Sequence, residues 1–259
     1  YGIALVVGPT GSGKTTTLHS ALGFINTEDM KIWTAEDPVE ITQPGLRQVQ
    51  VHPKIDFTFA VAMRSFLRAD PDVIMVGEMR DHETAATGIE ASLTGHLVFS
   101  TLHTNSAPET IIRLLDMDID PFNFADALLG IMAQRLVRTL CGACKEEYPP
   151  TAEEFAELVR DYGAEHWDKV GVSYSQSLRL CRAKGCAKCG GSGYKGRMGI
   201  HELLVATDDM KRMIQKRASV EEMRKQAMAE GMTTLLQDGI IKVLRGQTDF
   251  QQVRAVCIK

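Results

Sequence analysis

A glycine-rich segment near the start of the chain has the residue types and spacing of a phosphate-binding loop. Residues 8–15 read GPTGSGKT, which fits G-x-x-x-x-G-K-[ST] between a β-branched run and a helical pattern. Backbone N–H groups of such a turn and of the following helix surround phosphate oxygens. Lys14 would reach the β- and γ-phosphates and the Thr15 hydroxyl would bind Mg²⁺. The alternative is an ordinary glycine-rich turn between a strand and a helix. The residues expected to bind nucleotide are Gly8, Pro9, Thr10, Gly11, Ser12, Gly13, Lys14, Thr15 and Thr16, with Asp37 nearby.

Acidic residues follow two of the predicted strands. Phosphoryl transfer needs one acid to hold the metal, directly or through water, and a group that orients the attacking water. Ligands of a parallel sheet lie beyond the carboxyl ends of its strands. This excludes Asp70 and Asp72, which precede the predicted strand at 73–76, and favours Glu78, which follows it. A second group follows the predicted strand at 31–35: Glu36, Asp37 and Glu40. Each of these acids could instead be a solvated loop residue.

One histidine and two arginines are further candidates for a site at the carboxyl ends of the strands. His103 lies beyond the predicted strand at 97–101, where it could sense the γ-phosphate or hydrogen-bond an acid, whereas His96 precedes that strand and is expected to be structural. Arg64 and Arg68 are four residues apart on a helix predicted from about 57 to 68, with Asp56 or Thr58 as its cap. They are either a surface pair that bridges to acids or an arginine face offered to the phosphates of a neighbouring subunit.

Four cysteines have the spacing of a zinc site. Cys141 and Cys144 form one C-x-x-C knuckle, and Cys186 and Cys189 form another. Two knuckles together supply a tetrahedral, all-thiolate site with no open position, which indicates a structural zinc ion. The alternatives are a redox pair or unbound buried cysteines. Cys181 is a possible substitute ligand that lacks a partner in knuckle spacing.

Composition and periodicity indicate the class of protein and the fold that carry these motifs. The chain has 259 residues and a formal charge of -4, with basic and acidic residues interleaved, so no broad nucleic-acid surface is expected. No apolar run approaches the length of a membrane span. Strands alternating with helices predict an α/β fold with a parallel sheet. Residues 40–53 are expected to form a small hairpin around Pro44-Gly45, and helices are expected at 208–216, 219–229 and 232–244.

Taken in order, four motifs resemble those of the secretion ATPases that drive type II secretion and type IV pilus assembly. GPTGSGKTTTLH resembles the Walker A motif, EDPVE the Asp box, LRADPDVIMVGEMRD the Walker B motif and GHLVFSTLHTNSA the His box. GCAKCGGSGYKGRMGIHELL resembles the end of the zinc-binding subdomain of that family, and the paired knuckles resemble assembly and secretion motors more than retraction motors. The resemblance implies a RecA-like P-loop NTPase core at 1–140, a four-cysteine zinc-binding subdomain at 141–194 and a C-terminal strand plus helical subdomain at 195–259. It also implies a partner domain on the N-terminal side that this chain lacks.

The same resemblance implies the cofactors ATP, Mg²⁺ and Zn²⁺ and the roles of the site residues. Glu78 would be the Walker B acid, with the Asp-box acids beside it and His103 near the γ-phosphate, while Arg64 and Arg68 would act between subunits. The implied assembly is a homo-oligomer, a hexameric ring, that is cytoplasmic and peripheral at the inner membrane through a platform protein and a cytoplasmic adaptor. The resemblance implies neither nucleic-acid binding nor direct membrane insertion. Two other classes stay open: a P-loop nucleic-acid translocase, and a nucleotide-regulated switch with little hydrolysis.

Overall fold

The computed structural model describes residues 1–257, and the chain divides into two compact units. Unit 1 comprises Tyr1–Ala133 and Leu203–Met232, and unit 2 comprises Gln134–Glu202 and Thr233–Lys259. Within residues 1–257, no helix is long and apolar enough to cross a membrane. The predicted segment 195–259 is divided between the two units, and the two boundaries expected from the sequence, after residues 140 and 194, stay a prediction.

A mostly parallel sheet of order β3-β2-β4-β5-β1-β6-β9 organises the chain. Parallel pairing joins β1 to β5 and β6, β2 to β3 and β4, and β4 to β5. The α/β class is thus confirmed, and the strands predicted at 31–35, 73–76 and 97–101 lie within a residue of their expected bounds. The strands are β1 Gly2–Val7, β2 Ile32–Glu36, β3 Arg47–Gln50, β4 Val73–Val76, β5 Leu97–Leu102, β6 Leu128–Leu140 and β9 Tyr194–Val205.

The predicted hairpin at 40–53 is wrong. β3 pairs with β2 in parallel, as an edge strand, and residues 37–46 form the connection between them. Side chains of β3 bind this connection in place of the backbone hydrogen bonds of a hairpin. Gln48 Nε2 donates to Ile41 O at 2.7 Å, and Val39 N donates to Gln50 Oε1 at 3.3 Å. An alternating pattern beside a Pro-Gly turn fits either arrangement, so the sequence did not distinguish them.

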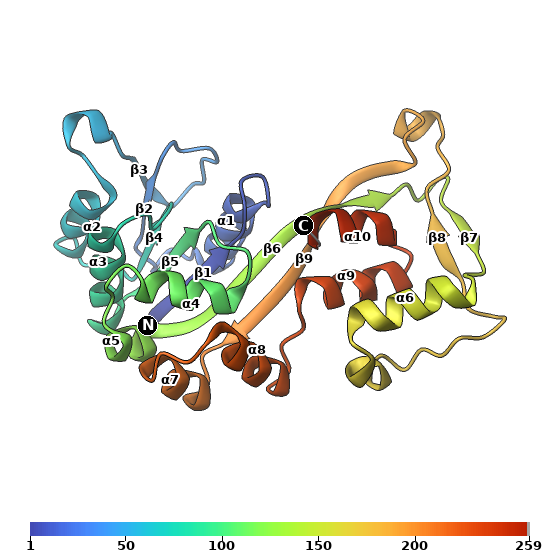
Figure 1. The fold of residues 1–259 in the computed structure, drawn as a ribbon. Coiled ribbons are helices and arrows are strands. Elements are labelled where there is room, and N and C mark those ends of the chain that lie inside the picture. Colours follow the sequence, from blue (N-terminus) through green and yellow to red (C-terminus); the bar gives the residue numbers. More distant parts are fainter. Residues whose placement is uncertain (258–259) are drawn as a thin grey trace. The chain divides into compact units, whose positions relative to one another are not determined.

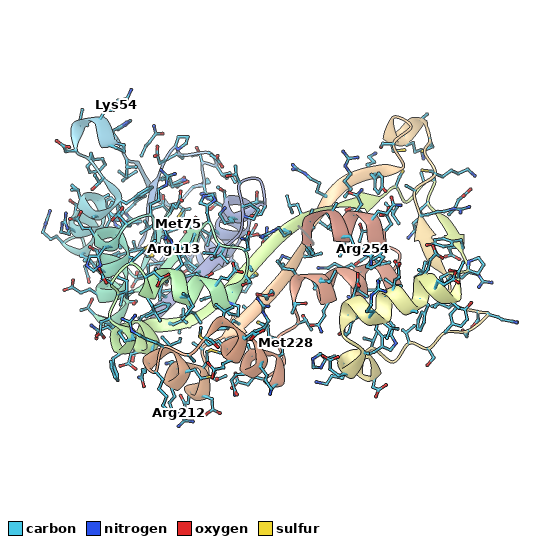
Figure 2. The ribbon with its side chains drawn as sticks, in the orientation of Figure 1. Lys54, Met75, Arg113, Arg212, Met228 and Arg254 are labelled. Carbon is cyan, nitrogen blue, oxygen red and sulfur yellow. The ribbon has the colours of Figure 1, made fainter. Side chains whose placement is uncertain are left out.

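Helices cover both faces of the parallel strands in unit 1 (Figure 1). Leu18 and Leu22 of α1 pack with Ile32, Val73 and Met75 of the sheet, and Met75 lies in this interior in Figure 2. Side-chain oxygens cap the N-termini of several helices. Thr58, one of the two predicted caps of α2, accepts a hydrogen bond from Val61 N. These helices are α1 Lys14–Ile25, α2 Phe59–Leu67, α3 His82–Leu93, α4 Ala107–Leu115 and α5 Pro121–Ala127.

The C-terminal helices are shared between the units. In unit 1, α7 Asp208–Gln215 packs on α5 and α8 Val220–Ala229 packs on α4. In unit 2, α9 Leu235–Leu244 packs against α6 Ala152–Tyr162 and α10 Phe250–Cys257. Unit 2 also holds the antiparallel pair β7 Glu146–Tyr148 and β8 Leu180–Arg182. Short 3₁₀ turns occur at Pro53–Ile55, Ala164–Val170 and Ala187–Cys189.

Candidate functional site

The phosphate loop has the predicted strand–turn–helix context. β1 ends at Val7 and α1 begins at Lys14. Gly11 and Gly13 adopt φ angles of 79° and 87°, a region that glycine enters at little cost. Lys14 Nζ donates to Gly8 O at 2.7 Å and to Pro9 O at 3.2 Å, so the ammonium folds back across the loop. Thr15 and Thr16 occupy the first turn of α1, where backbone N–H groups and the helix dipole favour an anion.

The carboxyl ends of four strands are tied together beside this loop. Gly8 N donates to Leu102 O at 3.2 Å, which links the start of the loop to the end of β5. Thr101 Oγ1 donates to Gly77 O at 2.7 Å, which links β5 to the residue that follows β4. Gly77 N in turn donates to Ala35 O of β2 at 2.8 Å. β5 therefore lies between the strand that leads to the phosphate loop and the strand that leads to Glu78, and all four strand ends share one edge.

Glu78 has a basic side chain on each side of its carboxylate. Arg80 Nε lies 2.7 Å from Glu78 Oε2, and His103 Nε2 lies 3.2 Å from Glu78 Oε1. The Glu78 side chain is only 16 % exposed, whereas those of Arg80 and His103 are 63 % and 43 % exposed. A carboxylate in this position can accept a proton from a water or hold a metal's water shell, and the two neighbours fix its orientation.

Glu36 lies deeper than the other acids of its group. It is buried at the end of β2, where Oε1 accepts from Thr34 Oγ1 at 2.6 Å and from Gln48 Nε2 at 3.0 Å, and Oε2 lies 3.1 Å from His19 Nε2. Both oxygens are therefore engaged within the protein. Asp37 and Glu40 lie in the following connection and are exposed, as expected for acids that face a ligand or solvent.

The two arginines of α2 are exposed. Arg64 Nη1 lies 2.9 Å from Glu83 Oε1 on α3, and Arg68 Nη2 donates to Ser65 Oγ at 3.3 Å. These contacts are those expected of a surface pair, and exposure also leaves both guanidinium groups accessible to a neighbouring subunit. The role between subunits stays a prediction.

Sequence reasoning missed two members of this site. Arg80 stands two residues after Glu78, and the only signal in the sequence is a basic residue in the same loop as the acid. His19 lies on the buried side of α1, five residues after Lys14, and contacts Glu36 of another element. A histidine inside an apolar helical pattern gives no indication of such a partner.

The four predicted cysteines come together in unit 2. The sulfur atoms of Cys141, Cys144, Cys186 and Cys189 all lie within 4.8 Å of one another, and Cys181 is not among them. Cys144 Sγ lies 3.9 Å from Cys189 Sγ. Backbone N–H groups of Cys186 and Gly193 each donate to Cys189 Sγ at 3.2 Å, which stabilises a thiolate. The substitute role for Cys181 receives no support from this arrangement.

The thiols of this cluster differ in acidity. Burial raises the pKa of the Cys144 thiol to about 12, whereas the backbone N–H of Cys186 lowers the pKa of the Cys189 thiol to about 6. An all-thiolate group at this spacing fits a tetrahedral zinc ion, because zinc ligands must be deprotonated and the ion itself holds thiols in that state. The donor set therefore fits the group predicted from the sequence.

Comparisons with known proteins agree with these motifs. Residues 1–255 match the family described as type II/IV secretion system protein. The chain is 48% identical over 261 residues to the type IV pilus assembly ATPase PilB of Thermus thermophilus, covering 100% of this chain and 28% of that protein. It is 48% identical over 256 residues to type II secretion system protein E of Pseudomonas aeruginosa, covering 99% of this chain and 48% of that protein.

A solved structure has the same fold. The crystal structure of the pilus retraction motor PilT with bound ADP matches with a TM-score of 0.69 and 28% identity, covering 100% of this chain and 62% of that one. This match supports the predicted α/β fold. The chain spans about half the length, or less, of these two curated relatives. The family match covers nearly all of the chain, and the relatives share close to half of its residues; the chain belongs to the type II/IV secretion system protein family.

Proposed function

We propose that this chain is the ATP-hydrolysing part of a motor for type II protein secretion or type IV pilus assembly. The observation that carries the proposal is a phosphate loop at the same sheet edge as a Glu78 carboxylate held by Arg80 and His103. The chain's likeness to a pilus assembly ATPase and to a type II secretion protein supports the assignment to these machines.

In the proposed reaction, the phosphate loop binds the phosphates of ATP. Lys14 would exchange the carbonyl oxygens of Gly8 and Pro9 for phosphate oxygens, and the Thr15 hydroxyl would hold Mg²⁺, which would supply charge neutralisation. Asp37 and Glu40 add negative charge at the same edge. The remaining contacts come from Gly8, Pro9, Thr10, Gly11, Ser12, Gly13 and Thr16.

Glu78 is the proposed general base. It takes a proton from the attacking water, or orients that water, at the end of β4, while Arg80 and His103 keep its carboxylate pointed toward the nucleotide. His103 then faces the γ-phosphate. Glu36 was a candidate for the same catalytic role, but its engaged oxygens support a positioning role instead.

The assembly is proposed from the family. A homo-oligomeric ring, with six subunits, would place Arg64 and Arg68 of one subunit against the nucleotide of the next, where guanidinium groups neutralise developing charge. Opening and closing of each site would move an inner-membrane platform protein, with a cytoplasmic adaptor, so that the motor is cytoplasmic and peripheral at the membrane. No nucleic acid takes part.

Zinc is proposed as a structural cofactor of unit 2. Cys141, Cys144, Cys186 and Cys189 would hold it, and the ion would fix the loops that carry the two knuckles. The four thiolates leave no open position for a substrate, so this ion takes no part in hydrolysis.

Phosphate release by the full-length protein tests the proposal. Purified protein with ATP and Mg²⁺ is expected to release phosphate, and Lys14→Ala is expected to abolish both release and binding of a fluorescent ATP analogue. Arg113→Ala, a matched cation on α4, is expected to change neither. Wild-type protein that binds the analogue without releasing phosphate would favour the regulatory switch over the motor.

A further inference from the structure

A buried hydrogen-bond network connects the phosphate-loop helix to the acidic connection between β2 and β3. His19 on α1 is 2 % exposed and Glu36 at the end of β2 is 3 % exposed, and the two side chains lie 3.1 Å apart through Nε2 and Oε2. Neither residue reaches the surface. The pair therefore joins the element that begins at Lys14 to the element that precedes Asp37.

The other ring nitrogen of His19 extends the network into the connection itself. His19 Nδ1 lies 3.3 Å from Gln43 Oε1, and Gln43 Nε2 donates to the backbone oxygen of His19 at 3.0 Å. Gln43 is thus bonded to both the side chain and the backbone of one residue of α1. A residue near the far end of the 37–46 connection is consequently fixed to the phosphate-loop helix.

Gln48 of β3 closes the network. Its Nε2 donates to Glu36 Oε1 at 3.0 Å and to Ile41 O at 2.7 Å, and its Oε1 accepts from Gln43 N at 2.8 Å. The connection is therefore fixed at Ile41 and at Gln43. The side chains that fix it are themselves hydrogen-bonded to Glu36 or to His19. Asp37 and Glu40 are the acids of this connection, and both are exposed.

We propose that His19 is a positioning residue that holds the acidic connection, residues 37–46, in register with the phosphate loop through Glu36 and Gln43. The inference rests on the proposed ATP hydrolysis. Charged groups at a reacting centre must be placed to within a fraction of an ångström, and a misplacement of about 1 Å can cost about 10²-fold in rate. His19 acts at a distance from the nucleotide, so its loss is expected to affect turnover more than binding.

The test compares substitutions of His19 in the full-length protein. His19→Phe keeps the approximate ring volume and removes both nitrogens; we expect kcat for ATP to fall about 10- to 100-fold while the ATP dissociation constant changes less than about threefold. His19→Gln retains an N–H donor for Glu36 and is expected to recover part of the lost kcat. Ser20→Ala, the exposed neighbour on the same helix, is the matched control and should match wild type.

A second variant keeps the proposal testable if His19→Phe does not fold. Gln43→Ala removes the bonds to His19 and leaves the His19–Glu36 pair, so kcat should fall and amide hydrogen exchange over residues 37–46 should become faster. Combined with His19→Gln, it should reduce kcat by less than the product of the two single effects, because both act through one network.

Three results would overturn the inference: unchanged kcat in folded Gln43→Ala, unchanged hydrogen exchange over residues 37–46, or loss of ATP binding in parallel with kcat. The last would indicate a general distortion of the phosphate loop. Failure of the underlying function is distinguishable, because in that case wild-type protein itself would release no phosphate from ATP.

Discussion

His103 and Glu78 come from the ends of neighbouring strands, and His103 Nε2 lies 3.2 Å from Glu78 Oε1. This contact orients the carboxylate that we propose as the base. Replacing His103 by alanine is expected to lower kcat for ATP hydrolysis by about 10²-fold, since a misplacement of a reacting group by about 1 Å can cost that much in rate. Steady-state phosphate release measures kcat, and equilibrium titration with a fluorescent ATP analogue should show little change in affinity.

His96 supplies the control for that variant. It precedes β5, at the opposite end of the strand, and its Nδ1 contacts Ala91 O at 2.9 Å. His96→Gln should therefore leave kcat near the wild-type value. Equal losses in the two variants would indicate a stability effect and contradict the specific role of His103.

Arg64 and Arg68 are expected to act in the active site of a neighbouring subunit. Arg64→Ala removes an exposed pair with Glu83, so the free energy of unfolding should change by less than about 1 kcal/mol. ATPase activity of the assembled oligomer should nevertheless fall, on the order of 10³-fold, if the guanidinium neutralises transition-state charge.

Mixed oligomers make this prediction specific. Subunits that carry Arg64→Ala and subunits that carry Glu78→Gln are both inactive in the proposed mechanism, but a mixed ring contains some sites with both groups intact. Mixing should restore measurable phosphate release. Absence of any recovery in confirmed mixed oligomers would show that Arg64 does not act between subunits.

Zinc is expected to be bound at about one ion per chain, because the four clustered thiols complete one tetrahedral site. Elemental analysis of purified protein measures this ratio. Cys144→Ala should lower it sharply and should increase hydrogen exchange around residues 186–193. Cys181→Ala is the matched control, because Cys181 is buried in the same unit and lies outside the cluster.

Gly193 is expected to be essential for the shape of the second knuckle. It has φ 76°, and an added Cβ would lie 2.6 Å from Ala183 Cβ, whereas Gly191 has φ 79° and open space around it. Both alanine variants should incur the left-handed backbone cost of about 1–2 kcal/mol. In Gly193→Ala the clash should lower the free energy of unfolding by about a further 1–3 kcal/mol. Denaturant unfolding measures this difference. Equal losses at the two positions would contradict this packing.

The periodic parts of the fold were predictable from the sequence because their signals are local. The run Val73–Val76 and the phosphate loop carry their pattern within a few residues, as do the two cysteine knuckles. Edge strand β3 was misread because parallel and antiparallel pairing differ in the partner, not in the strand's own residues. α6 was not among the helices predicted from the sequence, although Thr151 and Glu154 form a capping box at its start.

The candidate site was predictable to the extent that its residues follow strands. Glu78 and His103 were both expected at the sheet edge, but their mutual contact and the place of Arg80 depend on how loops from different strands fold toward each other. Glu36 illustrates the same limit: sequence position placed it with Asp37 and Glu40, while burial and three side-chain partners separate it from them.

The most direct test of the central claim is phosphate release by Glu78→Gln, measured beside ATP binding in the same preparation of the full-length protein. Glutamine keeps the shape of the side chain and an oxygen for Arg80 or His103 but removes the basic carboxylate. We predict an ATP affinity close to wild type and turnover reduced to background. Turnover retained at a substantial fraction of the wild-type rate would contradict the role of Glu78 and would transfer the role of base to Glu40.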